Sequence, residues 1–340
     1  MSRWKCAIGF VVLSLALSSA AVAADKLTYK MSTLTADTPS YLVMSAFADH
    51  ANKALEGAVV EVFAEGVAPH HALDAARGKT DFYLSAPSAY FFMNRGDAMY
   101  SGITDARELS KNLRGILNFP AGVYHIVTLA DSGIRSMKDI KGKKVFVGPA
   151  SGAAKAIAIN LVEGMSGLRA GIDFETVSTD WSAGAQALKN RDLDVYVNPA
   201  NLPSPLIHDI AQSQPLRFFG LAPEDYKSQA FIQQMKLPGR TLESFDPKIY
   251  GNNVSNTKPI QSVGSWIGIG THKQMSENDI YVMTRAFWEN IADVQSLAPW
   301  LASMMVEDAL IGMNMPLHPG AVKYYQEKGL VIPSDLIAKE

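Results

Sequence analysis

The sequence has almost no cysteine. Its 340 residues contain only Cys6, near the N-terminus, and no thiol follows it. Disulfide bridges, thiolate zinc sites and cysteine nucleophiles are therefore excluded from the rest of the chain. An excess of basic charge is also missing, because the formal net charge is −2 at pH 7. This argues against a nucleic-acid partner, which favours a basic face.

Long apolar runs are absent after the first residues. The chain opens with Arg3 and Lys5, continues with an apolar run over residues 7–17, and then has small residues up to Ala24. The run is shorter than the roughly 20 residues that a bilayer core requires. We therefore expect residues 1–24 to be a secretory signal peptide, cleaved after Ala23 or Ala24, and the mature protein to have no stable membrane insertion.

What the sequence does contain is a repeated alternation of strands and helices. Apolar segments predict strands at 27–32, 59–64 and 81–85, with helices between them. The pattern returns after Gly122, and its strands are predicted at 123–129, 145–147, 174–177 and 193–198. Two similar rounds predict the α/β class, with two Rossmann-like lobes that each contain a parallel sheet.

One more strand, predicted at 262–271, would return the chain to the first lobe. Ser276 then caps a predicted helix, and the remaining tail is expected to pack on the same lobe. Residues 214–261 show no clear period and are assigned only to the second lobe and the crossover. The predicted parts are lobe one at 25–122 plus 262–340, lobe two at 123–261, and hinge strands near 122–129 and 262–271.

The most informative stretch is residues 136–155. A strand there leads into a Gly/Pro/Ser loop and then into an Ala-rich helix, so backbone N–H groups at the helix N-terminus could hold a small anion. Ser151 could donate to the anion, Gly152 lets the backbone approach, and Lys155 could add a charge. The alternative is an ordinary helix cap with a solvated lysine. A nucleotide loop is excluded, because it needs four residues between its glycines, followed by Lys-Ser/Thr.

Other candidate ligand contacts follow predicted strands, where ligands bind in open α/β sheets. Each hydroxyl or aromatic side chain among them could instead cap a helix or pack in the core. The complete predicted set is Thr33, Thr35, Tyr41, Gly66, Val67, Ser85, Ser88, Tyr90, Ala150, Ser151, Gly152, Ala153, Lys155, Trp181 and Asn198.

Signatures of catalysis and of metal binding are not evident. The segment around Ser151 does not have the Gly-x-Ser-x-Gly spacing of a nucleophile elbow. His70 and His71 are adjacent, without a second pair of ligands at a metal-binding spacing. We therefore expect no enzyme activity, no metal and no cofactor.

Several motifs together resemble a known family. They are Asp139–Val145 leading into Gly148–Gly152, Asp192–Tyr196, Pro203 with Pro205, and His318–Ala321 followed by Tyr324, Tyr325 and Glu327. The chain resembles the TAXI-type solute receptors of TRAP transporters, which have the type II periplasmic binding protein fold. It departs from that family at residues 33–38 and 64–68, where members usually carry glycines and Thr-x-Gly-Ser.

The resemblance implies a periplasmic solute-binding receptor. Such a protein would capture a small organic anion, a carboxylate by our interpretation, between its lobes and deliver it to a TRAP-type integral membrane permease. Two alternatives remain open from the sequence. One is the substrate-binding protein of an ATP-driven importer, and the other is a periplasmic enzyme on the same fold.

Overall fold

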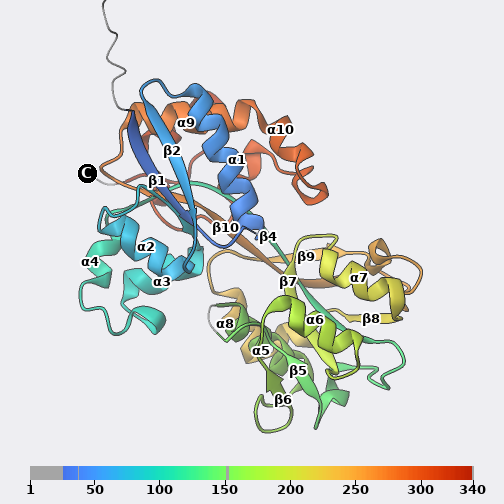
Figure 1. Cartoon of the computed structure of the whole chain (residues 1–340). Coiled ribbons are helices and arrows are strands. Elements are labelled where there is room, and N and C mark those ends of the chain that lie inside the picture. The colour runs from blue at the N-terminus through green and yellow to red at the C-terminus, as the bar shows by residue number, and fades with distance from the viewer. Residues whose placement is uncertain (1–25, 37, 151–152, 339–340) are drawn as a thin grey trace, which may run out of the picture.

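The fold has two lobes connected by long strands (Figure 1). It is seen in a computed structural model that describes residues 26–36, 38–150 and 153–338. The predicted signal peptide lies outside these residues. The predicted α/β class, with two rounds of parallel strands and helices, is confirmed.

In lobe one, β1 (Leu27–Thr33) lies between β2 (Ala58–Ala64) and β3 (Phe82–Ser85) and pairs in parallel with both. The helix after each strand has a proline in its first two positions, where a backbone N–H has no partner within the helix. These proline positions explain why the helices begin soon after the strands end. The helices of this lobe are α1 (Pro39–Ala54), α2 (Ala68–Ala76), α3 (Pro87–Arg95), α4 (Ala106–Ser110), α9 (Glu277–Glu289), α10 (Ile291–Ser296) and α11 (Pro319–Glu327).

Lobe two repeats this plan. β5 (Lys144–Phe146) lies between β6 (Glu175–Val177) and β7 (Val195–Ala200), again in parallel. Asp180 caps the helix after β6, because its Oδ1 accepts from the Ala183 N–H at 2.8 Å. The helices after the three strands are α5 (Ala153–Ser166), α6 (Trp181–Lys189) and α7 (Pro205–Ser213).

Two long antiparallel strands, β4 (Leu113–Leu129) and β10 (Ile260–His272), run through both lobes; we call them the hinge strands. They join the lobes into one sheet, ordered β2-β1-β3-β10-β4-β7-β5-β6. The predicted start of β4 at residue 123 is wrong by ten residues. Gly115, Asn118 and Pro120 interrupt the apolar pattern, and pairing with β10 keeps this segment extended.

The region that sequence patterns left unassigned completes the crossover. β8 (Leu216–Phe219) pairs with β4, and β9 (Arg240–Phe245) pairs with β10. The short helix α8 (Gln229–Met235) lies between them in sequence. All three elements are short, and two of them depend on pairing with a hinge strand. The alternation of apolar and polar residues within such short segments is therefore insufficient to predict them.

Each lobe has its own hydrophobic core. In lobe one, the Phe47 ring lies 6.1 Å from that of Phe82 and 5.6 Å from that of Phe287, measured between centroids. In lobe two, separate clusters fill the two faces of the sheet, one containing Val145 below α5 and the other containing Phe146 below α6. The C-terminal segment adds to lobe one, where the Tyr325 hydroxyl donates to the Ile116 carbonyl at 2.9 Å.

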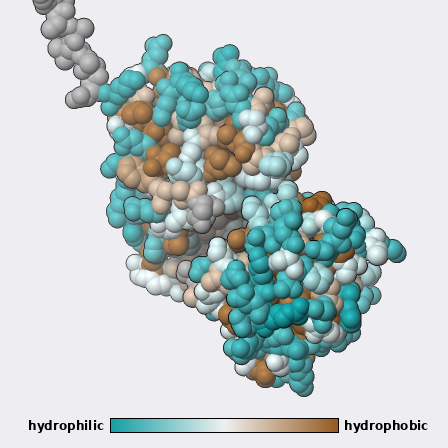
Figure 2. Space-filling view, turned by 45° about the vertical axis from the view of Figure 1, so that its right-hand side comes forward, coloured by the Kyte–Doolittle hydropathy of each residue, from teal (hydrophilic) through white to brown (hydrophobic). Residues whose placement is uncertain are grey.

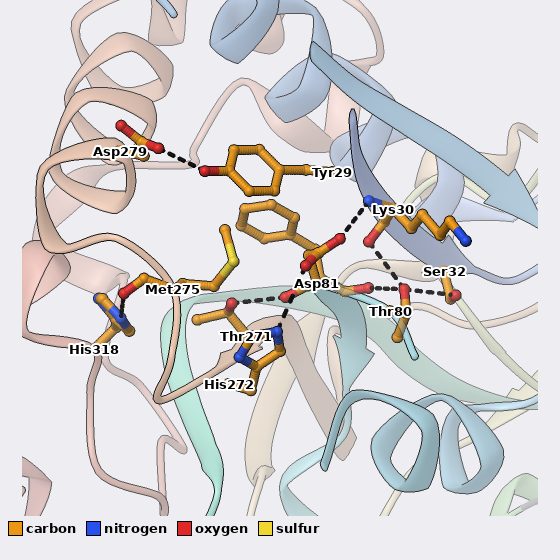
Figure 3. Close-up of polar contacts among 11 residues, drawn as sticks. Tyr29, Lys30, Ser32, Thr80, Asp81, Thr271, His272, Met275, Asp279 and His318 are labelled. Atoms are coloured by element: carbon orange, nitrogen blue, oxygen red, sulfur yellow. Dashed lines mark hydrogen bonds and ion pairs between the residues drawn. The ribbon is translucent and has the colours of Figure 1, made fainter. Parts of the chain in front are cut away.

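A polar network around Asp81 holds together β1, β3 and β10 (Figure 3). Asp81 Oδ2 accepts from the Lys30 N–H at 2.8 Å, and its backbone carbonyl accepts from Thr271 Oγ1 at 2.7 Å. His272 Nε2 lies 3.6 Å from Asp81 Oδ1. Burial opposes ionisation of this carboxyl, but the contacts with His272 and Lys30 outweigh it and lower its pKa.

Asp81→Ala is expected to lower the free energy of unfolding by about 1–3 kcal/mol, because a half-buried carboxylate loses its charge-assisted hydrogen bond from the Lys30 N–H and its contact with His272. Urea denaturation measures the change. The control is Asp105→Ala, which removes an exposed carboxylate 3.7 Å from Arg77 and should cost less than about 1 kcal/mol. Equal losses in the two variants would show that the network adds nothing beyond a surface ion pair.

Candidate functional site

The carboxyl ends of β1, β2 and β3 form the edge of lobe one that faces lobe two (Figure 1). Thr33 ends β1 beside Ala64 at the end of β2, and Ser85 ends β3. The Thr33 and Ser85 hydroxyls are buried and have no hydrogen-bond partner among the described residues. Both predicted residues therefore lie at the expected edge, but neither is open to solvent in this conformation.

The other predicted contacts of lobe one lie in the loops and first helical turns beyond this edge. Thr35 and Gly66 are exposed, while Tyr41 and Val67 are half-buried. Near Gly66, the His71 Nε2 lies 2.6 Å from the Glu65 carbonyl oxygen, so this imidazole is engaged within its own loop. The two remaining members, buried Ser88 and half-buried Tyr90, belong to the first turn of α3.

In lobe two, the predicted anion loop follows β5. Ala150 is exposed and Lys155 is half-buried in the first turn of α5, which begins at Ala153. Ser151 and Gly152 lie outside the described residues. The two ends of the loop thus lie at the carboxyl end of β5, in the lobe-two part of the sheet, and no contact is described for its centre.

Trp181 and Asn198 are connected to one another through Tyr196. The Asn198 Nδ2 donates to the Tyr196 hydroxyl at 2.9 Å, and that hydroxyl donates to the Trp181 carbonyl at 2.9 Å. The Trp181 ring contacts Phe146 edge to face, with 5.6 Å between centroids. A Cβ on Gly148 would lie 3.0 Å from the same ring. These contacts attach the start of the anion loop to α6 and β7.

Arg240, the first residue of β9, is absent from the contacts that sequence patterns predicted. Its Nη1 donates to Ser265 Oγ on β10, and its Nε is buried without a hydrogen-bond partner among the described residues. No described carboxylate lies within 4 Å of the guanidinium. Burial lowers the pKa of this group, yet an arginine in a protein stays charged. It is therefore a partly buried cation with no anionic partner in the described part of the chain.

Arg240 follows α8, a helix that packs against α5. Asn160 of α5 donates to Gln234 of α8 at 3.3 Å, and further along α5 a Cβ on Gly164 would lie 3.0 Å from Ser228 Oγ. The two helices are therefore antiparallel. The chain that leaves α8 and leads to Arg240 consequently runs toward the first turn of α5, where the N-terminal end of the helix dipole also favours an anion.

A hollow separates the two lobes in the space-filling view (Figure 2). Arg240 belongs to β9, which pairs with the hinge strand β10. Among the described residues, no three His, Cys, Asp or Glu side chains are grouped as metal ligands. Within residues 26–36, 38–150 and 153–338, no helix combines the length and the apolar character needed to cross a membrane.

A model of the NMT1-like family matches residues 86–329 of the sequence. The chain belongs to the NMT1-like family. The match begins immediately after β3 and includes all of lobe two and both hinge strands. This family assignment is coarser than the TAXI-type resemblance stated from the motifs.

Solved structures similar to this NMT1-like chain include three periplasmic binding proteins. A TRAP solute-binding protein from a Sulfitobacter species, with bound β-D-galacturonate, is 14% identical, with 79% of this chain and 80% of that chain covered and a TM-score of 0.41. One from Chromohalobacter salexigens, with bound D-glucuronate, is 14% identical, with coverage of 88% and 84% and a TM-score of 0.43. The aliphatic sulphonate binding protein of Escherichia coli is 11% identical, with coverage of 91% and 90% and a TM-score of 0.46.

Proposed function

We propose that this NMT1-like protein is a two-lobed receptor that captures a small organic anion, with a carboxylate, in the space between its lobes. The observation that carries the proposal is Arg240, a partly buried guanidinium at the hinge without a carboxylate partner among the described residues. An uncompensated buried charge is costly, so a site of this kind gains free energy when an anion arrives.

The guanidinium suits a carboxylate because its planar fork can donate two parallel hydrogen bonds. The Ser265 hydroxyl oxygen accepts a hydrogen bond from Nη1 of Arg240, and this bond fixes the orientation of the guanidinium plane. Lys155 adds a second positive charge in the first turn of α5, and we keep the Ser151–Gly152 loop beside it as part of the proposed site. Loops from both lobes surround the anion, so binding would favour a closed arrangement of the lobes.

The finer assignments are part of the same proposal. The leader at 1–24 would direct the protein to the periplasm, and the lobes would divide at residues 122 and 262. The partner would be a TRAP-type integral membrane permease that receives the anion from the closed receptor, as in the TAXI-type family. The protein would act by binding and release, without catalysis, metal or cofactor.

A thermal-shift screen of small carboxylates tests the proposal. D-Glucuronate is one probe, because a similar protein was solved with it, and D-glucose is its neutral counterpart. The carboxylate that binds should raise the melting temperature as its concentration rises, whereas its neutral counterpart should not. If neutral solutes stabilise the protein and none of the acids does, the assignment to an organic anion is wrong.

Arg240→Gln is expected to weaken binding of that carboxylate roughly tenfold to 100-fold, because one or two charge-assisted hydrogen bonds are lost. Isothermal titration calorimetry measures the affinity. Arg217→Gln is the matched control, since Arg217 on β8 also has a buried Nε without a partner but lies away from the hinge crossing. An unchanged affinity in Arg240→Gln, or an equal loss in both variants, would remove Arg240 from the site.

A further inference from the structure

A cavity of about 550 Å³ lies against the hinge strands, and none of the predicted contacts that the structure describes lines it. Its walls come from both lobes. Lobe one contributes the segment 299–308 and the first half of β4, and lobe two contributes Asn201, Leu202 and Glu243 of β9. We call this space the hinge cavity. Because both lobes line it, its shape depends on how the lobes are placed relative to one another.

The hinge cavity and Arg240 both lie against the β9–β10 pair. Side chains alternate between the two faces of a strand, so residues 240 and 243 point to opposite sides. A Cβ on Gly264 would contact the Glu243 side chain, so these two residues share one face of the β9–β10 pair. Trp266 lies two residues further along β10 and therefore points to the same face. Arg240 contacts Ser265, which is itself one of the residues that line the cavity. The cavity and the proposed anion site therefore adjoin at Ser265, although the side chains of Arg240 and Glu243 point to opposite faces of β9.

The lining of the hinge cavity is aromatic and acidic. Trp266 and Trp300 supply indole rings, and Glu243 and Asp308 supply carboxylates from opposite lobes. None of the sixteen lining residues, all within the described part of the chain, is Lys, Arg or His. Neither carboxylate forms an ion pair with a described residue; Glu243 Oε1 only accepts from Thr241 Oγ1 at 2.7 Å.

A buried acceptor in the same wall also lacks a partner. Asn118 is 1% exposed, and its Nδ2 donates to the Ile311 carbonyl at 2.9 Å, which fixes the orientation of the amide. Its Oδ1 accepts no hydrogen bond from any described residue. This oxygen lies against Gly268 of β10, where an added Cβ would overlap it, so the acceptor is packed within the sheet and does not face the cavity.

We propose that the hinge cavity is a second binding site, for a small organic cation that combines an ammonium group with an apolar body. The carboxylates of Glu243 and Asp308 would neutralise the ammonium, and the indole faces of Trp266 and Trp300 would attract it as well as the apolar body. A cation held by both lobes shifts the balance between open and closed forms by its difference in affinity for the two. The site does not depend on the proposed anion function.

Isothermal titration of the full-length mature protein with benzylamine, which is charged at pH 7, tests this site. Benzyl alcohol is the neutral probe of nearly the same shape. We expect benzylamine to bind at least about tenfold more tightly than the alcohol, because only the cation interacts with the carboxylates and the indole faces. Equal affinity for the two probes, or no binding of benzylamine by the folded protein, would overturn the proposal.

Variants separate this site from general attraction to a negative surface. Asp308→Asn and Trp300→Leu should each weaken benzylamine binding about tenfold. Glu307→Gln removes the neighbouring exposed carboxylate, which does not line the cavity, and should leave the affinity unchanged. A loss in Glu307→Gln equal to that in Asp308→Asn would refute the site. Carboxylate titrations report on the anion site and amine titrations on the hinge cavity, so failure of the one and failure of the other are distinguishable.

Discussion

Gly122→Ala is expected to destabilise the protein by about 3–5 kcal/mol, which combines backbone strain with overpacking. Gly122 lies in β4 at the crossing between the lobes and has a φ of +116°, which L-residues rarely adopt. A Cβ there would also lie 2.6 Å from the Ala200 carbonyl oxygen and 2.8 Å from the Asn201 nitrogen. The backbone of β7 must move to admit a methyl group, because neither contact is with a flexible side chain.

Gly133→Ala is the matched control for this substitution. Gly133 also has a positive φ, +84°, but a Cβ there would meet nothing within 4 Å. Only the backbone strain remains, so the expected loss is about 1–2 kcal/mol. Urea denaturation of both variants measures the difference. Losses of similar size would show that β7 yields easily and that the close approach at the hinge does not constrain it.

Lowering the pH from 7 to 4.5 is expected to destabilise the protein through His125, a completely buried imidazole on β4. Its Nδ1 donates to the Val123 carbonyl at 2.8 Å, and its Nε2 accepts from the Tyr250 hydroxyl at 2.8 Å. That hydroxyl in turn accepts from the Ser204 N–H at 2.8 Å. The chain of bonds requires a neutral imidazole, and burial lowers the pKa of His125 to about 4.

The sign of the pH effect follows from linkage. Below pH 6.5 the unfolded chain binds a proton at this histidine, whereas the folded protein binds it only near pH 4. The contribution of neutral His125 to the free energy of unfolding is therefore fully present above pH 6.5 and is lost as the pH falls from 6.5 to 4. The total loss is roughly 3 kcal/mol, since each pH unit of separation is worth about 1.4 kcal/mol. His318, whose pKa burial also lowers to about 4, acts in the same direction.

Chemical denaturation at pH 7 and at pH 4.5 measures this loss. His125→Gln should be less stable at pH 7 but should lose less stability between the two pH values than the unmodified protein does. His208→Gln, at an exposed position of α7, should leave the difference unchanged. A difference in His125→Gln as large as that of the unmodified protein would assign the acid sensitivity to other groups.

Local patterns in the sequence were sufficient to predict an element when it has a clear apolar periodicity or a capping residue. The first strand was predicted at 27–32 and ends one residue later, at Thr33. Ser276 was predicted as a helix cap, and its Oγ accepts from the Asp279 N–H at 3.3 Å. These signals depend on residues within one or two turns of each other, so a single sequence contains them in full.

Features that depend on distant segments were not predictable in this way. Arg240 is a partly buried cation only because β9 pairs with β10, where Ser265 lies 25 residues further along the chain. Asn118 is buried because residue 311 of the C-terminal segment covers it. Neither side chain belongs to a local motif. Their burial and their hydrogen-bond partners are set by contacts between distant segments, and the sequence pattern does not specify which segments pair.

The placement of β10 between β3 and β4 has a consequence for the order of events during synthesis. β10 spans residues 260–272, so the first 129 residues cannot complete their sheet when they leave the ribosome. The N-terminal strands must wait for more than 130 further residues, and contacts of such long range form slowly. Nascent chains of this protein therefore stay incompletely folded until translation is nearly finished, and truncations before residue 272 should not yield a folded first lobe.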